Sequence, residues 1–287
     1  MAASCASKRL PVPRLRSLTS AWTLLALLLL ASSAEAAPEV VETFPDAFAA
    51  LRDLLGKRRV IAFGELHEIA GKSDARSSLA RFHTELLGPL LPFASDLIVE
   101  TWVTTGSCGE TEKKVVAEVE NSTQRPATTE NEIITVLKQA KAGGVAPHML
   151  EIDCHDYAAL TDAKTGEVDY EKLLSLVTRG LERQMNAALA RSPKSDKAVL
   201  VYGGALHNDV FPRRELAAYS FARTMTKRTR GRYLEIDLYV PEYIEHDDRL
   251  TAEAWYGRYQ RAAQPGRVVR VRRSDDSYIF VFPRTPR

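Results

Sequence analysis

Two histidines in this chain share one setting, a short apolar run that ends in Gly-x-x-His. The first run, V-I-A-F-G-E-L-H, holds Gly64 and His67, and the second, V-L-V-Y-G-G-A-L-H, holds Gly204 and His207. A buried parallel strand is a continuous apolar run rich in β-branched residues and bounded by glycine. Each histidine is therefore expected just past the carboxyl end of a strand, where open α/β sheets bind ligands. The two halves of the chain are predicted to build one site.

Carboxylates follow the same predicted strand ends. Glu65 and Glu68 follow the first strand, and Glu100 ends the second. The third and fourth strands are followed by a mixed set of acids and a histidine, Asp153, His155, Asp156 and Asp209. Mixed histidine and carboxylate ligands suit a divalent ion such as Mn, Co, Zn or Fe, which polarises a carbonyl and acidifies bound water. Without a metal, a histidine oriented by a carboxylate can act as a general base on water.

Each of these residues also has a structural alternative. Glu100 could cap a neighbouring helix or pair with Arg76, because an unpaired buried carboxylate is costly. His67 could be a turn residue, since histidine tolerates strained loops. The glycines before His207 could serve only a loop that needs positive φ. Asp153 is expected to cap the segment that follows it.

The elements that must position these residues alternate between strand and helix. Alternation over this length predicts an α/β fold with a largely parallel central sheet, helices on both faces and a C-terminal antiparallel hairpin. Strands are expected at residues 59–64, 96–101, 148–153, 197–204 and 233–240, with the hairpin at 268–272 and 278–282. Helices are expected at residues 45–55, 73–91, 130–142, 170–191 and 250–262, with a short one at 112–120 in a polar loop.

The first 36 residues have the three parts of a secretory signal peptide. A basic start is followed by the apolar residues 21–31 and then by Ala34-Glu35-Ala36, a small-x-small cleavage pattern. The apolar part is shorter than the roughly 20 residues of a membrane-spanning helix, although an uncleaved anchor is the alternative. We expect an exported chain, periplasmic or extracellular, whose residues 37–287 form one domain without a stable membrane span.

Removal of this leader changes the net charge of the chain and leaves two of its three cysteines. The leader carries four basic residues and one acid, so the net charge falls from +2 to −1. This balance excludes the strongly basic class of nucleic-acid-binding proteins. Cys108 and Cys154 remain, and an even pair in an oxidising compartment suggests a disulfide if the two Cα atoms lie within about 7 Å.

The order of these motifs resembles the superfamily that joins erythromycin esterases, ChaN-type haem-binding proteins and Tiki/TraB-type proteases. Gly64-Glu65-Leu66-His67 is similar to the Gly-Glu-x-His start of esterase and ChaN members. Glu100 matches their second-strand glutamate, and His207 matches their closing histidine. Arg76 stands where esterase members carry a functional arginine.

The resemblance implies two kinds of function. In a hydrolase, the four Glu and His residues would activate water, directly or through a divalent metal, against an ester or amide of a small molecule or peptide. Arg76 would hold a substrate carboxylate or stabilise negative charge. In a haem- or metal-uptake protein, His67 or His207 would be an axial ligand. We expect the hydrolase, because a haem slot is largely apolar and the residues around both motifs are polar.

Overall fold

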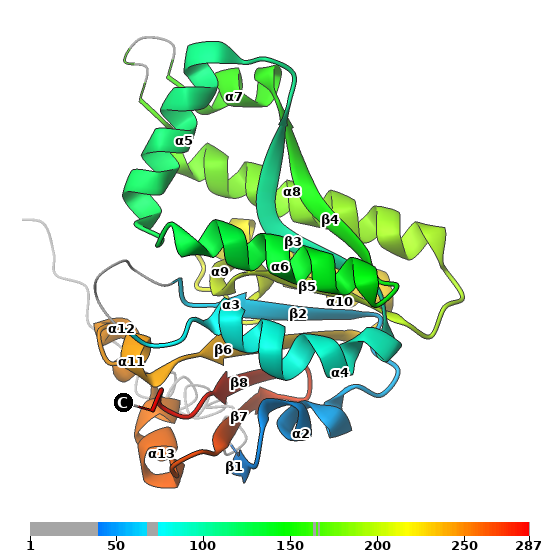
Figure 1. Cartoon of the computed structure of the whole chain (residues 1–287), viewed down its shortest axis with the longest axis vertical. Helices are drawn as coiled ribbons and strands as arrows, with labels where there is room; N and C mark the ends of the chain where they lie inside the picture. The colour runs from blue at the N-terminus through cyan, green and yellow to red at the C-terminus, as the bar shows by residue number, and fades with distance from the viewer. Residues whose placement is uncertain (1–39, 68–73, 163–164, 166, 287) are drawn as a thin grey trace, which may run out of the picture. The chain divides into compact units, whose positions relative to one another are not determined.

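The computed structural model describes residues 40–67, 74–162, 165 and 167–286, which belong to one structural unit, residues 39–287 (Figure 1). The expected signal peptide and Glu68 lie outside these residues. Of the helices in the described ranges, none has the length and apolar character that a membrane crossing needs.

One eight-stranded sheet is the centre of this unit, in the order β1-β7-β8-β6-β2-β5-β3-β4. The strands are β1 Val41–Phe44, β2 Val60–Glu65, β3 Ala94–Thr105, β4 Ala146–Asp153, β5 Ala198–Gly204, β6 Tyr233–Tyr239, β7 Val268–Ser274 and β8 Ser277–Val281. Pairing is parallel from β8 through β6, β2, β5 and β3 to β4, whereas β7 is antiparallel to β8 and β1. The predicted mixed α/β sheet with its C-terminal hairpin is confirmed; β1 was not expected.

Helices cover both faces of the sheet because the central strands are apolar on both sides. Ile61 and Phe63 of β2 pack on one face, against α2 Ala47–Leu51, α3 Ser78–Arg81, α4 Gly88–Leu90 and α6 Thr128–Ala142. Val60 and Ala62 pack on the other face, against α8 Tyr170–Arg191 and α10 Ala222–Thr229 (Figure 1). The C-terminal hairpin is covered by α11 Pro241–Ile244 and α13 Ala254–Ala262, and α12 Asp248–Thr251 links these two helices.

Strand β3 is twice as long as expected, which changes the position of Glu100. The strand pairs with β5 as far as Val99↔Tyr202, and its register with β4 then shifts and continues to Thr105↔Asp153. The expectation that Glu100 ends its strand is therefore wrong. Glu100 lies where β3 leaves β5, and the ladder with β4 keeps the next five residues extended.

Beyond Glu100, β3 and β4 form a two-stranded extension that carries two helices. The polar region expected to hold only a short helix is α5 Gly109–Thr123, which lies beside α7 Cys154–Leu160 at the tip of the two strands (Figure 1). We call residues 101–123 and 150–160 the arm.

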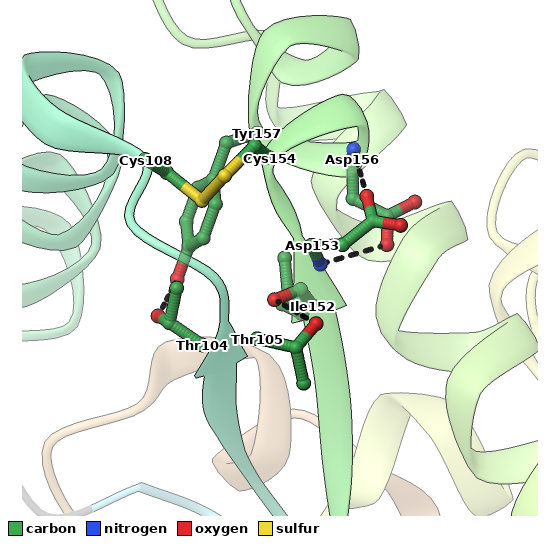
Figure 2. The surroundings of a disulfide bond; sticks show 8 residues. All are labelled: Thr104, Thr105, Cys108, Ile152, Asp153, Cys154, Asp156 and Tyr157. Carbon is green, nitrogen blue, oxygen red and sulfur yellow. Dashed lines mark hydrogen bonds between the residues drawn. A yellow bond between two sulfur atoms is a disulfide. The ribbon is translucent and has the colours of Figure 1, made fainter.

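A disulfide closes the tip of the arm. Cys108, just before α5, is bonded to Cys154, the first residue of α7, with the two Cα atoms 4.9 Å apart. Beside it, the hydroxyl groups of Thr104 and Tyr157 are 2.9 Å apart (Figure 2). The bond thus fixes the start of α5 to the strand that ends at Asp153.

Candidate functional site

The strand register brings three of the expected residues to the middle of one sheet edge. Glu65 at the end of β2 pairs with Gly204 at the end of β5. Glu100 follows Val99, which pairs with Tyr202, so its side chain lies beside Gly203. His207 belongs to α9 Ala205–Asn208, the short helix that starts directly after β5. The two halves of the sequence therefore meet in this region.

Glu65 and His67 form a hydrogen-bonded pair. The Glu65 Oε1 atom lies 2.9 Å from His67 Nδ1, and its Oε2 atom accepts the hydroxyl of Tyr202. A carboxylate only accepts, so Nδ1 carries a proton, and in the neutral imidazole the lone pair is then on Nε2. Burial works against ionisation of Glu65, but the hydrogen bond to His67, the charge of Arg125 and the Tyr202 hydroxyl outweigh it and lower its pKa. Glu65 is therefore a charged orienting group at neutral pH.

Arg125 is the third member of this group, although no motif in the sequence points to it. It lies between α5 and α6, after Gln124, whose left-handed φ of 48° ends α5. Its Nη2 atom donates to Glu65 Oε1 at 3.1 Å. The same atom lies 3.0 Å from His67 Nε2 and also contacts Nδ1. One atom this close to both ring nitrogens lies over the face of the imidazole, because in the ring plane the two nitrogens point in different directions.

Glu100 and His207 form a second, looser pair. The Glu100 Oε2 atom accepts the backbone N–H of Gly204 at 2.7 Å, and Oε1 lies 3.7 Å from His207 Nε2. The His207 Nδ1 atom lies 3.0 Å from the carbonyl oxygen of Tyr219 and 2.9 Å from the Thr178 hydroxyl oxygen. Because a carbonyl only accepts, Nδ1 is protonated and Nε2 faces Glu100. His207 itself is buried.

The two pairs face each other across Gly204. A Cβ atom at Gly204 would lie 3.0 Å from His67 Nε2 and 3.6 Å from Glu100 Oε2. A Cβ atom at Gly203 would collide with the Glu100 carboxylate. The glycine pair therefore has a steric role, since it leaves room for the Glu100 carboxylate and for the His67 ring.

Arg76, expected to serve the site, lies elsewhere. Its side chain is exposed before α3, where it bonds the hydroxyl of Thr84 and lies 3.6 Å from Glu85. Arg125 is the arginine that contacts Glu65 and His67. Arg76 was expected from its sequence position alone, whereas Arg125 reaches the site through the fold of the arm.

The acids of the third strand are also remote. Asp153 pairs with Thr105, five residues beyond Glu100, which corresponds to about 17 Å along the strand. Asp153 and Asp156 form a capping box at the start of α7, as expected for Asp153. Their ligand atoms and that of His155 lie within 4.8 Å of one another. Capping explains the placement of both acids.

A buried acidic cluster anchors the turn that follows His207. Asp209, Glu235 and Asp237 surround Arg273, at 3.2, 3.3 and 3.5 Å. Burial raises the pKa of Asp237 to about 6, although Arg273 opposes the shift. The backbone N–H of Val210 donates to Glu235. The cluster thereby fastens the His207 turn to β6.

The four predicted ligands do not form a metal site as they are placed. Among the residues that the structure describes, the group whose ligand atoms come within 4.8 Å of one another is at Asp153, and it includes none of the four. Arg125 also puts a positive charge 3.1 Å from the Glu65 carboxylate. For haem, the neighbours of the two histidines are polar or charged, unlike an apolar slot.

Comparison of the chain with protein-family models, with curated proteins and with solved structures found no match. The resemblance to the esterase, ChaN and Tiki superfamily stays a prediction from the motifs.

Proposed function

We propose that this chain is an exported hydrolase that activates water with two Glu–His pairs and cleaves an ester or amide. The observation that carries the proposal is the convergence of His67 Nε2 and Glu100 Oε2 on the space above Gly204. Export rests on the leader pattern of residues 1–36.

In the proposed reaction, His67 is the general base. Ionised Glu65 holds the Nδ1–H form, as a carboxylate does in a catalytic triad, and leaves the Nε2 lone pair to accept a proton. A water molecule above Gly204 gives one proton to Nε2 while its oxygen attacks the carbonyl carbon. The C–O or C–N bond then breaks, and His67 returns the proton to the departing oxygen or nitrogen.

Glu100 holds the attacking water from the other side. Its carboxylate is fixed by the N–H of Gly204 and faces His207, so its free lone pairs can accept the second proton of the water as a hydrogen bond. His207 is buried and acts through Glu100, which makes it a positioning residue.

The test is a comparison of the purified mature chain with its Glu65→Ala and His67→Ala variants on a panel of p-nitrophenyl esters and peptide anilides. Loss of a positioned base lowers kcat by about 10²- to 10⁴-fold, so both variants should lose that much while their circular dichroism stays unchanged. His83→Ala, a histidine on the helix after α3, is the control and should keep full activity.

Two outcomes would contradict the proposal. One is wild-type activity in both variants. The other is a Soret band on haem titration that disappears in the His67→Ala or His207→Ala variant, which would favour the haem-binding alternative. Metal analysis of the purified protein, with activity measured before and after chelation, tests the need for a divalent ion.

A further inference from the structure

Within the described residues, the contacts of the Arg125 guanidinium with Glu65 and His67 are made by one of its three nitrogen atoms. All three of its contacts there, with Glu65 Oε1 and the two ring nitrogens of His67, are made by Nη2. Glu65 accepts one of the two N–H groups of Nη2, so the other four guanidinium donors have no hydrogen-bond acceptor among the described carboxylates and carbonyls that contact Arg125. Nη2 shares one donor edge with Nη1 and the other with Nε, so one of these two edges keeps both of its donors. The Arg125 side chain as a whole is 22% exposed.

The two carboxylates nearby already have their own donors. Glu65 is bonded by His67 and Tyr202, and Glu100 is bonded by the backbone of Gly204. An anion at the donor edge that Glu65 does not use would meet two parallel N–H groups of the guanidinium. Bidentate pairing of this kind is the strongest way in which arginine binds a carboxylate.

The backbone holds Arg125 in place before any ligand arrives. Gln124 before it has left-handed geometry, and Pro126 after it has its φ fixed by the ring and restricts the φ and ψ of Arg125. The start of α5, the helix that leads to this turn, is tied to α7 by the disulfide. A preorganised cation loses little entropy when it binds an anion.

We propose that the free edge of Arg125 binds a carboxylate of the substrate, so that the enzyme acts on esters or amides that carry a carboxylate close to the scissile bond. The binding step stands on the contacts of Arg125 alone, whereas the cleavage step rests on the proposed function.

Binding is tested without turnover, by calorimetric titration of the mature chain with succinate and with its neutral dimethyl ester. The wild type should bind succinate and not the diester. Loss of charge-assisted hydrogen bonds should weaken succinate binding by about 10- to 100-fold in Arg125→Met and less in Arg125→Lys. Arg249→Met removes an exposed arginine that pairs with Asp247 and should leave binding unchanged. Equal binding by Arg125→Met and the wild type, or no binding of succinate by the wild type, overturns the proposal.

Specificity is tested with p-nitrophenyl hydrogen succinate and its methyl ester. Because Arg125 also contacts Glu65, its loss lowers hydrolysis of both esters, so the readout is the ratio of the two kcat/KM values. That ratio should fall by about 10-fold or more in Arg125→Met, and an unchanged ratio contradicts the proposal. If succinate binding depends on Arg125 but no ester or anilide is cleaved, the proposed function fails and the anion site stands. If esters are cleaved but succinate binds equally well to Arg125→Met and to the wild type, the anion site fails and the proposed function stands.

Discussion

Replacement of Gly204 by alanine tests the space on which the proposed chemistry depends. Gly204 has φ −65° and ψ 139°, a conformation that alanine adopts without strain. The added methyl group would enter the space above Gly204, 3.0 Å from His67 Nε2. The substitution therefore changes the site while it leaves the backbone as it is.

The structure gives the size of both effects. Carbon and other heavy atoms pack at about 3.5 Å or more, so His67 must retreat by about 0.5 Å or weaken its bond to Glu65. The methyl group also occupies the place of the attacking water. A misplacement on this scale, together with lost water, should lower kcat/KM by about 100-fold or more. Stability should change by less than about 1 kcal/mol, because alanine in place of an unstrained glycine stabilises by about 0.4–1 kcal/mol and offsets the close contact.

The assay compares kcat/KM on the best ester of the panel with the melting temperature by calorimetry. A change of about 1 kcal/mol shifts Tm by about 2–4 °C in a domain of this size, so Tm should stay within that range. Gly257→Ala in α13 makes the same chemical change beside Arg261, at an ordinary contact of 3.7 Å, and should keep full activity. Full activity of Gly204→Ala with an unchanged Tm would refute the assignment of this space to the reaction.

The second glycine, the disulfide and the buried acidic cluster can each be tested in the same way. Gly203→Ala should displace Glu100, with which its methyl group collides, and lower both Tm and kcat/KM, whereas a Tm and activity equal to the wild type would contradict the steric role of this glycine. Reduction of the disulfide, which links residues 46 apart, should lower the free energy of unfolding by about 4 kcal/mol in guanidinium titration, and no change on adding reductant would show that the bond adds nothing. The raised pKa of Asp237 means that its contribution to stability falls as pH rises from about 4 to about 6, because the folded state holds the proton longer than the unfolded state does. The difference in stability between the wild type and Asp237→Asn should therefore vary with pH in that window, and a constant difference would argue against the shift.

The fold could be predicted well from sequence because its central strands are apolar on both faces. The runs at Val60–Glu65 and Ala198–Gly204 needed no partner information, since a continuous apolar segment of this length, bounded by glycine, is typical of a buried strand in an α/β chain. The extension of β3 was not predictable in this way. Its outer residues, such as Thr104 and Thr105, are polar, and they are held in place by β4, whose pairing is not visible in local composition.

The site shows the same division between local and long-range signals. Glu65 and Glu100 were predicted because carboxylates at apolar strands are conspicuous, and the structure places each beside a histidine. Arg125 lies in a polar loop without hydrophobic periodicity, so no sequence pattern marks it as a site residue. Tyr202 lies in an apolar strand, and nothing in that strand's sequence indicates that its hydroxyl bonds Glu65. Arg76 was expected because it stands where esterase members carry an arginine, and a matching position in the sequence does not determine which way a side chain turns.

The pairing of β2 has a consequence for when the proposed site can form as the chain folds. Both neighbours of β2 come late in the chain, and Tyr202, the partner of Glu65, lies 137 residues after it. Contacts of such long sequence separation close loops at a high entropic cost and form slowly. A nascent chain that has not yet reached β5 carries Glu65, His67 and Glu100 without the glycine pair that spaces them. The proposed site therefore forms only after β5 has paired with β2, and chains that end before β5 would lack it.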